Sequence, residues 1–476
     1  GRDGRVLSRR AGDAREAAEL AAWWTLSDGP SSAASLDARS LRATSTSLVV
    51  GLPSRRGAKE TAAEPSRETL AAAVARAAAA WERPAVEGRS RVEAGQGEAW
   101  VLLASPCGTD GETDTDSGLT ALFATAAADA ARAPRDVRVE PWVVADGAGV
   151  LVHGPALAGE TPTAHARRLA DVAARSFAAE PLAAPALARA RADLLRRDAR
   201  GDGSALAVLA SALAPRHPSW IVAWGASEPL ARSSDAAVVG RAQALRAGPL
   251  RIAVLANADA AQAEAAVRAA DRWIARRTGE ARACRAMTAA QPPRPGTYAT
   301  PHPGAIPEAY LAFPFPAGDE AAYRAALVVA SALDDGRRGD GGLLERALGG
   351  AAPLARESSA RVLGWPRAPA LVVRIVAREA SLDGAVMQAR ALVDRLRSSG
   401  LAPADLERAT AARARAAIET ALDPRARVVA TWRGEPVEAA ARVRVTADEL
   451  RSFAQRHLTE DTMIVVASRP PRPGPP

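Results

Sequence analysis

The chain has 476 residues, of which 48% are apolar and 4% aromatic, and its formal net charge is +8. This length and apolar content suit two to four globular domains and exclude an intrinsically disordered chain. No charge-free apolar run reaches the roughly 18 residues of a membrane-spanning helix, and no basic patch carries the stacking aromatics of a nucleic-acid-binding protein. We therefore expect no transmembrane segment and no nucleic-acid partner.

Residues 1–88 contain helical patterns near 13–24 and 66–81, with a strand between them. The same order returns about 200 residues later, where WGASEPL (224–230) matches WTLSDGP (24–30), and AEAAVRAADRW (263–273) matches LAAAVARAAAAW (70–81). An ordered recurrence at a fixed period indicates an internal repeat. We interpret residues 1–88 as the C-terminal part of one repeat.

Residues 89–286 are predicted to form one complete repeat, and it opens with a strand, a turn and a helix. Trp100 to Ala104 is a short apolar run, and a turn rich in Gly, Asp and Thr follows it at 108–116. From Ser117 onward, apolar residues recur at helical spacing. Ser117 or Asp116 is the predicted N-cap, because its side-chain oxygen can accept a free first-turn N–H.

The remainder of residues 89–286 mixes strands with amphipathic helices. Two strands, 137–144 and 149–153, flank a hairpin signal at Asp146 and Gly147, and long helical patterns follow at 162–179 and 184–199. A further helix, a strand at 250–255 and a closing helix complete the unit. This order predicts an α+β sandwich, with helices on one face of a mainly antiparallel sheet.

The same plan returns in residues 305–469, after a segment rich in Pro and Gly at 287–304 that we interpret as a linker. Strands are predicted at 309–313, 370–376 and 463–467, with helices at 319–333, 382–398, 403–421 and 446–457. Pro403 at a first helical position and Asp405 in the first turn favour a helix start there. The tail, 470–476, is too rich in Pro to pack.

These elements resemble the insulinase/pitrilysin-like zinc peptidases, the inverted-zincin family that includes mitochondrial processing peptidase. The resemblance lies in the strand, turn and helix of residues 100–130, in LAPADLERA (401–409) and in VTADELRSFA (445–454). It implies tandem homologous sandwich domains in a clamshell arrangement, joined by a linker.

The zinc motif of that family is missing from this chain. The family's helix opens G-L-x-H-x-x-E-H, and its two histidines fall on Ala121 and Thr125, while its glutamate falls on Ala124. The five histidines of the chain form neither H-x-x-E-H nor H-E-x-x-H, so no helical zinc pair exists. We therefore expect no catalytic residue, metal or cofactor here.

The resemblance also implies a substrate-binding Arg and Tyr in the C-terminal domain. The matching stretch is LLERALGGAAPLARESSARV (343–362), where Arg356 stands at the tyrosine position and Gly349 near the arginine position. Arg346 and Arg356 are the candidates for contact with a peptide, because guanidinium groups bind carbonyls and carboxylates well. The alternative is that both are ordinary surface arginines.

The two cysteines, Cys107 and Cys284, form no C-x-x-C pair, and the sequence leaves open whether they are bonded to each other. Nearly all the basic residues are arginine, Lys59 being the only lysine, which is typical of GC-rich bacterial genomes. We expect a periplasmic or cell-envelope protein.

Together these features predict a non-catalytic insulinase-like homologue. Its expected role is the inactive, substrate-binding or regulatory subunit of a heteromeric zinc peptidase, paired with an H-x-x-E-H-bearing homologue or with itself, and acting on a peptide or protein. The alternatives are a scaffold subunit of a larger envelope or membrane-associated complex, and a metallopeptidase whose site differs from the family pattern.

Overall fold

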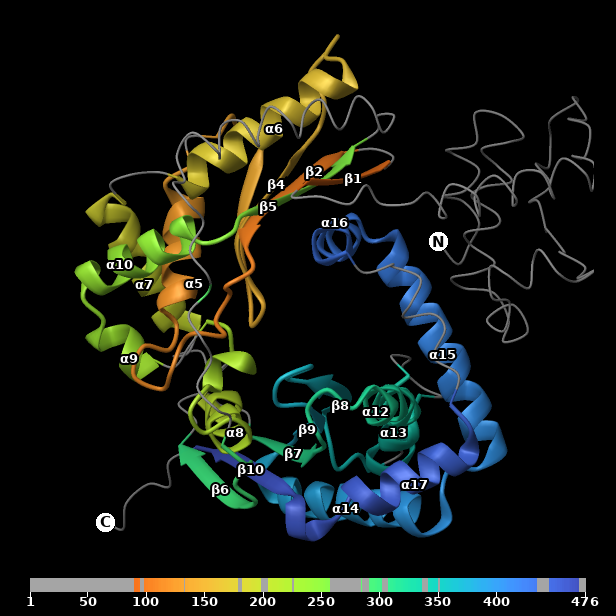
Figure 1. Ribbon diagram of the computed structural model, residues 1–476. Coiled ribbons are helices and arrows are strands. Elements are labelled where there is room, and N and C mark those ends of the chain that lie inside the picture. The colour runs from red at the N-terminus through yellow and green to blue at the C-terminus, as the bar shows by residue number, and fades with distance from the viewer. Residues whose placement is uncertain are drawn as a thin grey trace, which may run out of the picture.

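The computed structural model describes residues 90–94, 98–131, 133–178, 182–197, 204–224, 227–256, 284, 291–301, 307–335, 341–349, 352–434 and 445–470. Over these ranges the chain forms two five-stranded sheets, each with helices packed on one face (Figure 1). This is the predicted α+β architecture in two tandem domains. The proposed repeat at 1–88 and the tail at 471–476 lie outside the described residues.

The first domain has a sheet in the order β1-β5-β2-β4-β3. Its strands are β1 (Ser90–Ala94), β2 (Ala99–Ser105), β3 (Arg138–Val144), β4 (Gly147–Gly154) and β5 (Arg251–Ala256). The neighbours are antiparallel except β1 and β5, which run parallel. Successive side chains point to opposite faces, so Val101 and Leu103 face the helices, while Leu102 and Ala104 face the other side.

Apart from α8 (Ser204–Leu213), the helices of the first domain lie on the side of this sheet that points away from the second domain, and they enclose its core (Figure 1). Phe123 and Phe177 meet there edge to face, with ring centroids 5.4 Å apart. Thr161 caps α6 (Pro162–Phe177) by accepting the Ala164 N–H. The helices are α5 (Leu119–Asp129), α6 (Pro162–Phe177), α7 (Ala184–Arg197), α8 (Ser204–Leu213), α9 (Ser227–Arg232) and α10 (Asp235–Ala247), with a 3-10 turn, η2, at Pro218–Trp220.

The second domain repeats the topology, with its sheet in the order β6-β10-β7-β9-β8 and a parallel pair formed by β6 and β10. Its strands are β6 (Gly296–Pro301), β7 (Glu308–Pro314), β8 (Glu357–Leu363), β9 (Ala370–Val376) and β10 (Ile464–Arg469). Its helices are α12 (Glu320–Leu333), α13 (Leu343–Leu348), α14 (Glu379–Ser399), α15 (Pro403–Leu422), α16 (Pro424–Arg433) and α17 (Ala447–His457). A 3-10 turn, η4 (Glu460–Thr462), precedes the last strand.

The two domains exchange one helix each. Helix α8 of the first domain packs on β10, β7 and β6, while α16 of the second domain packs on β5, β2 and β1. In Figure 1, α8 lies over the lower sheet and α16 lies beside the upper one. Trp432 of α16 is 2% exposed, meets Trp142 of β3 edge to face at 5.0 Å and donates its indole N–H to the Arg251 carbonyl. In each domain, the sheet face that points toward the other domain is thus covered by a helix of that other domain.

Among the described residues, three ion pairs also join the domains. Arg367, in the turn between β8 and β9, donates to Asp110 at 2.9 Å. On α16, Arg425 pairs with Glu140 and Arg433 with Asp146, each at 2.9 Å. Such pairs, unlike the apolar helix contacts, weaken in high salt.

Three strands, β1, β6 and β8, were missed by the sequence patterns, and each lies at the edge of its sheet. Strand β6 lies inside the segment 287–304 that was predicted as a linker, and it pairs with β10. The second domain therefore begins at Gly296 or earlier, which corrects the predicted boundary at residue 305. Its terminal Pro301 is tolerated because an edge strand has one row of N–H groups outside the ladder. Strand β8 falls in the stretch interpreted as a substrate-binding segment, and its mixed polar sequence ESSARVL hides the strand period.

Cys107 and Cys284 form a disulfide, with Cα atoms 5.2 Å apart. This answers a question that the sequence left open. Within the described ranges, no helix is long and apolar enough to cross a lipid bilayer.

Candidate functional site

The helix that matches the family's zinc helix is α5, and the structure places small core side chains at its ligand positions. Ala121 is 4% exposed and Ala124 is fully buried, while Thr125 is partly buried. The helix packs against α7 and α10 and against β3 and β4. The face that would hold zinc is therefore filled by close packing, which leaves little room for imidazole or carboxylate side chains.

The start of α5 differs from the sequence prediction. The N-cap is Gly118, at φ 92°, and because glycine has no side chain, it cannot itself cap a free N–H of the helix. A Cβ at Gly118 would lie 2.8 Å from the Leu230 side chain, so only glycine fits. The predicted caps have other partners: Asp116 accepts from the Thr113 hydroxyl, and Ser117 bonds to Ser219 at 2.8 Å.

The Glu112 carboxylate takes over the capping role from six residues upstream. One oxygen accepts the Thr120 N–H at 2.6 Å, and the other accepts the Gly118 N–H and the Ser219 hydroxyl, both at 2.9 Å. A carboxylate at a helix N-terminus is also favoured by the helix dipole. Glu112 was missed as an individual residue, although the turn that contains it was part of the resemblance.

The network around Glu112 extends to a segment more than 100 residues away. His217 Nδ1 bonds to the Glu112 carbonyl at 2.8 Å, and its ring stacks on Trp220 at 4.3 Å. Arg241 donates its Nε–H to the Thr120 hydroxyl at 2.9 Å. The turn before α5, η2 and α10 are therefore held together by buried polar contacts.

Burial raises the pKa of the Glu112 carboxyl, and the opposing hydrogen bonds from Thr120 and Gly118, with the Arg241 guanidinium, do not cancel that effect. A raised pKa is a property of many catalytic acids. Here, however, three donors occupy the two oxygens and the side chain is 1% exposed. Glu112 therefore has no open position for a substrate, and its role in this geometry is to hold the turn on the helix.

The four histidines among the described residues each have a local contact. His165 bonds to the Gly154 carbonyl at 3.0 Å, His153 lies between Glu98 and Glu140 and stacks on Trp100, and His457 packs beside Phe315 and Phe453. His302 lies outside the described ranges. Across the part of the chain that the structure describes, no three His, Cys, Asp or Glu side chains are grouped as metal ligands.

The two arginines predicted to bind substrate are placed on different elements. Arg346 lies on α13 and pairs with Asp405 of α15 at 2.6 Å, a carboxylate that also bonds to Arg408. The Asp405 pKa is lowered: burial opposes the shift, and the bonds from Arg346 and Arg408 outweigh it. Arg356 is exposed and lies immediately before β8, where its backbone N–H donates to Val376. The structure thus gives Arg346 a structural partner and leaves the substrate role of both residues a prediction.

Comparison with solved structures identifies the fold. The chain is similar to the peptidase M16 inactive domain from Pseudomonas fluorescens, with 15% identity and a TM-score of 0.65, over 81% of this chain and 97% of that one. It is also similar to a putative M16-like peptidase from Alicyclobacillus acidocaldarius, with 15% identity, a TM-score of 0.63 and coverage of 80% and 96%.

A chain of complex III2 from Candida albicans matches too, with 11% identity, a TM-score of 0.62 and coverage of 80% and 93%. No protein-family model and no curated protein matches the sequence. The insulinase-like (M16) fold predicted from short motifs is therefore confirmed. At these identities the likeness concerns the fold, and function has to be argued from the site.

Proposed function

We propose that this chain, which has the M16 fold without its H-x-x-E-H motif, is a non-catalytic binding subunit that pairs with an H-x-x-E-H-bearing homologue. The observation that carries the proposal is the state of α5. The Glu112 carboxylate accepts hydrogen bonds from the first N–H groups of this helix. The positions of a zinc ligand and of the catalytic glutamate instead hold the buried, closely packed Ala121 and Ala124. The chain therefore has the hydrogen-bonded turn and helix of this fold but lacks the side chains that bind zinc and activate water.

Binding is the function that such a scaffold can still perform. One structure with the same fold is itself named an inactive domain of a peptidase. In a pair of such chains, the active member supplies zinc and this chain supplies part of the surface that holds a peptide or protein substrate. A second copy of this chain is the other partner that the fold allows.

The test is purification of the protein from its source cells under mild conditions, followed by identification and activity assay of what is bound. We expect a stoichiometric homologue with an intact H-x-x-E-H motif, whose peptidase activity rises at least about tenfold when this chain is added back. Equal activity of that homologue with and without this chain would contradict the proposal. Zinc retained by this chain alone would point instead to a peptidase site outside the family pattern.

A scaffold subunit of a larger assembly is a second candidate, favoured by the similarity to a chain of complex III2. The same purification separates the two. Recovery of a stable multi-subunit assembly with no H-x-x-E-H homologue supports the scaffold.

We further propose a periplasmic or cell-envelope location. The Cys107–Cys284 disulfide supports it, because disulfides persist in oxidising compartments and are rare in the bacterial cytoplasm. Thiol labelling of the protein in intact and denatured cell fractions tests this: both cysteines should stay unlabelled until a reductant is added. Free thiols in protein taken directly from cells would contradict it.

A further inference from the structure

The side chain of Arg413, in the second domain, has no counter-charge among the residues that the structure describes. Arg413 lies in the middle of α15 and is partly buried, and it forms no hydrogen bond or ion pair with any residue that the structure describes. Its Nε is fully enclosed. Leaving a guanidinium unpaired in a partly dry place is costly, because the charge loses hydration without gaining a counter-charge. A structural role would be better served by an apolar side chain.

Helix α15, which carries Arg413, packs against α12, which carries Tyr323. Burial lowers the pKa of the Arg413 guanidinium, and Tyr323 acts weakly in the opposite direction, while no described carboxylate has a resolved influence on it. Tyr323 stacks on Trp365 with ring centroids 4.1 Å apart and planes 11° from parallel. Both aromatic residues are partly exposed. A cation beside a flat aromatic pair is a suitable place for an anion attached to an apolar group.

The position in the fold suits a partner as well. Trp365 belongs to the turn between β8 and β9, and two residues later Arg367 reaches the first domain at Asp110. That aspartate lies in the turn that leads to Glu112 and α5. The cluster of Tyr323, Trp365 and Arg413 therefore lies on the side of the second domain that borders the degenerate helix region.

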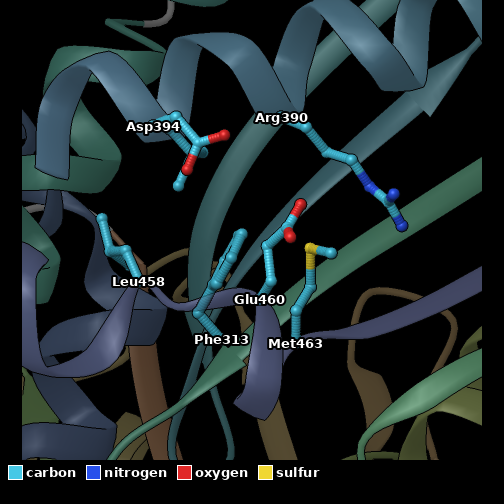
Figure 2. A pocket seen from close by; sticks show the side chains of 7 residues that line it. Phe313, Arg390, Asp394, Leu458, Glu460 and Met463 are labelled. Carbon is cyan, nitrogen blue, oxygen red and sulfur yellow. The ribbon is translucent and has the colours of Figure 1, made fainter.

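Two other arginines of the same domain show what Arg413 lacks. Arg346 is neutralised by Asp405. Arg390 of α14 also has an enclosed Nε without a partner, but it lines a small pocket together with Asp394 and Glu460. Figure 2 shows Glu460 pointing toward α14 between these two residues, above the apolar Phe313 and Met463. Two carboxylates make that pocket unsuitable for an anion.

We infer that Arg413, Tyr323 and Trp365 form a binding site for a carboxylate of a peptide, with the aromatic pair holding an adjacent apolar side chain. The carboxylate is either the peptide's C-terminus or an acidic side chain. This site deepens the proposed function, on which it rests, by naming a chemical class of ligand. The Arg413 guanidinium donates hydrogen bonds to the carboxylate, and the ligand supplies a counter-charge that none of the described residues provides.

The experiment uses the full chain without any partner, so its outcome is independent of whether a peptidase subunit exists. Three peptides are titrated calorimetrically: acetyl-Ala-Phe-Ala with a free C-terminus, acetyl-Ala-Phe-Glu-amide, and acetyl-Ala-Phe-Ala-amide. We expect at least one acidic peptide to bind about tenfold or more tightly than the uncharged amide, as charge-assisted hydrogen bonds do. Which of the two acids prevails identifies the source of the carboxylate.

Substitutions then assign the effect. Arg413→Ala should abolish the preference for the acid, and Arg413→Lys, which keeps the charge but not the planar fork, should retain part of it. The matched control is Arg390→Ala, which removes another enclosed guanidinium of the same domain and should leave binding unchanged. Equal affinity of the acidic and uncharged peptides for the unmodified protein, or an unchanged preference in Arg413→Ala, would overturn the inference.

Discussion

The two domains share one topology, yet they begin their equivalent helices α5 and α12 in different ways. In the second domain, Asp319 caps α12 locally by accepting the Ala322 N–H at 2.9 Å. In the first domain, α5 begins at a glycine, and its N–H groups are satisfied by Glu112 from within the protein. The start of α12 is therefore capped locally by a half-exposed side chain, whereas the start of α5 lies at the centre of a buried hydrogen-bond network.

The two domains also differ in disulfide bonding. The first domain is closed by the Cys107–Cys284 disulfide, and the described residues of the second contain no cysteine. The buried Glu112 network and the disulfide thus both lie in the domain that carries α5, the helix whose zinc-ligand positions hold Ala121 and Thr125. Four measurements test this difference between the two domains.

The largest effect should come from the disulfide. It joins residues 177 positions apart, and the chain-entropy model assigns such a loop up to about 5 kcal/mol of unfolding free energy. Urea unfolding of the Cys107→Ser/Cys284→Ser protein, with hydrogen exchange to localise the loss, should show it in the first domain. Equal loosening of both domains would mean that they unfold as one unit.

The second effect concerns Glu112. Its replacement by alanine leaves two backbone N–H groups and the Ser219 hydroxyl buried without an acceptor, at a cost of about 3 kcal/mol or more. Chemical denaturation measures the change. A loss below about 1 kcal/mol would show that water replaces the carboxylate and that the network is not a structural centre.

Asp319→Ala is the matched variant in the second domain, since it also removes a carboxylate from a helix start. Because this cap is half exposed and satisfies one N–H, the expected cost is only about 1 kcal/mol. The ratio of the two losses, measured in the same buffer, quantifies the difference between the domains. Similar losses would remove the distinction.

The smallest effect is a pH response of opposite sign in the two domains. Burial raises the pKa of Glu112 above 4.5, so its contribution to stability increases as the pH falls through the folded pKa toward 4.5. Burial, aided by Arg456, lowers the pKa of His457 below 6.5, so stability near α17 decreases as the pH falls through 6.5.

Domain-resolved hydrogen exchange between pH 7 and 4.5 reads both changes. The variants Glu112→Gln and His457→Gln do not titrate at these positions and serve as controls, each removing the response of its own domain. A response of the same sign in both domains would contradict the assignment.

Much of the fold follows from the sequence because the relevant information is local. The continuous apolar runs of β2 and β9 and the helical spacing in α6 and α15 predicted those elements to within a few residues. Edge strands β1, β6 and β8 were missed, since an edge strand tolerates Pro and polar residues and therefore lacks a clear apolar pattern. The absence of H-x-x-E-H is likewise plain in the sequence.

Tertiary structure decided the rest. The sequence itself determined two α+β domains with a helix of small residues in place of zinc ligands, because side-chain period and motif spacing depend on near neighbours. Only the folded chain showed that Glu112 accepts from Ser219, and that α8 and α16 each pack on the other domain's sheet. It also showed that Asp405 pairs with Arg346, whereas Arg413 has no ion-pair partner in the ranges that the structure describes. These contacts join residues tens to hundreds of positions apart, and a side chain's partner there is chosen by packing in three dimensions.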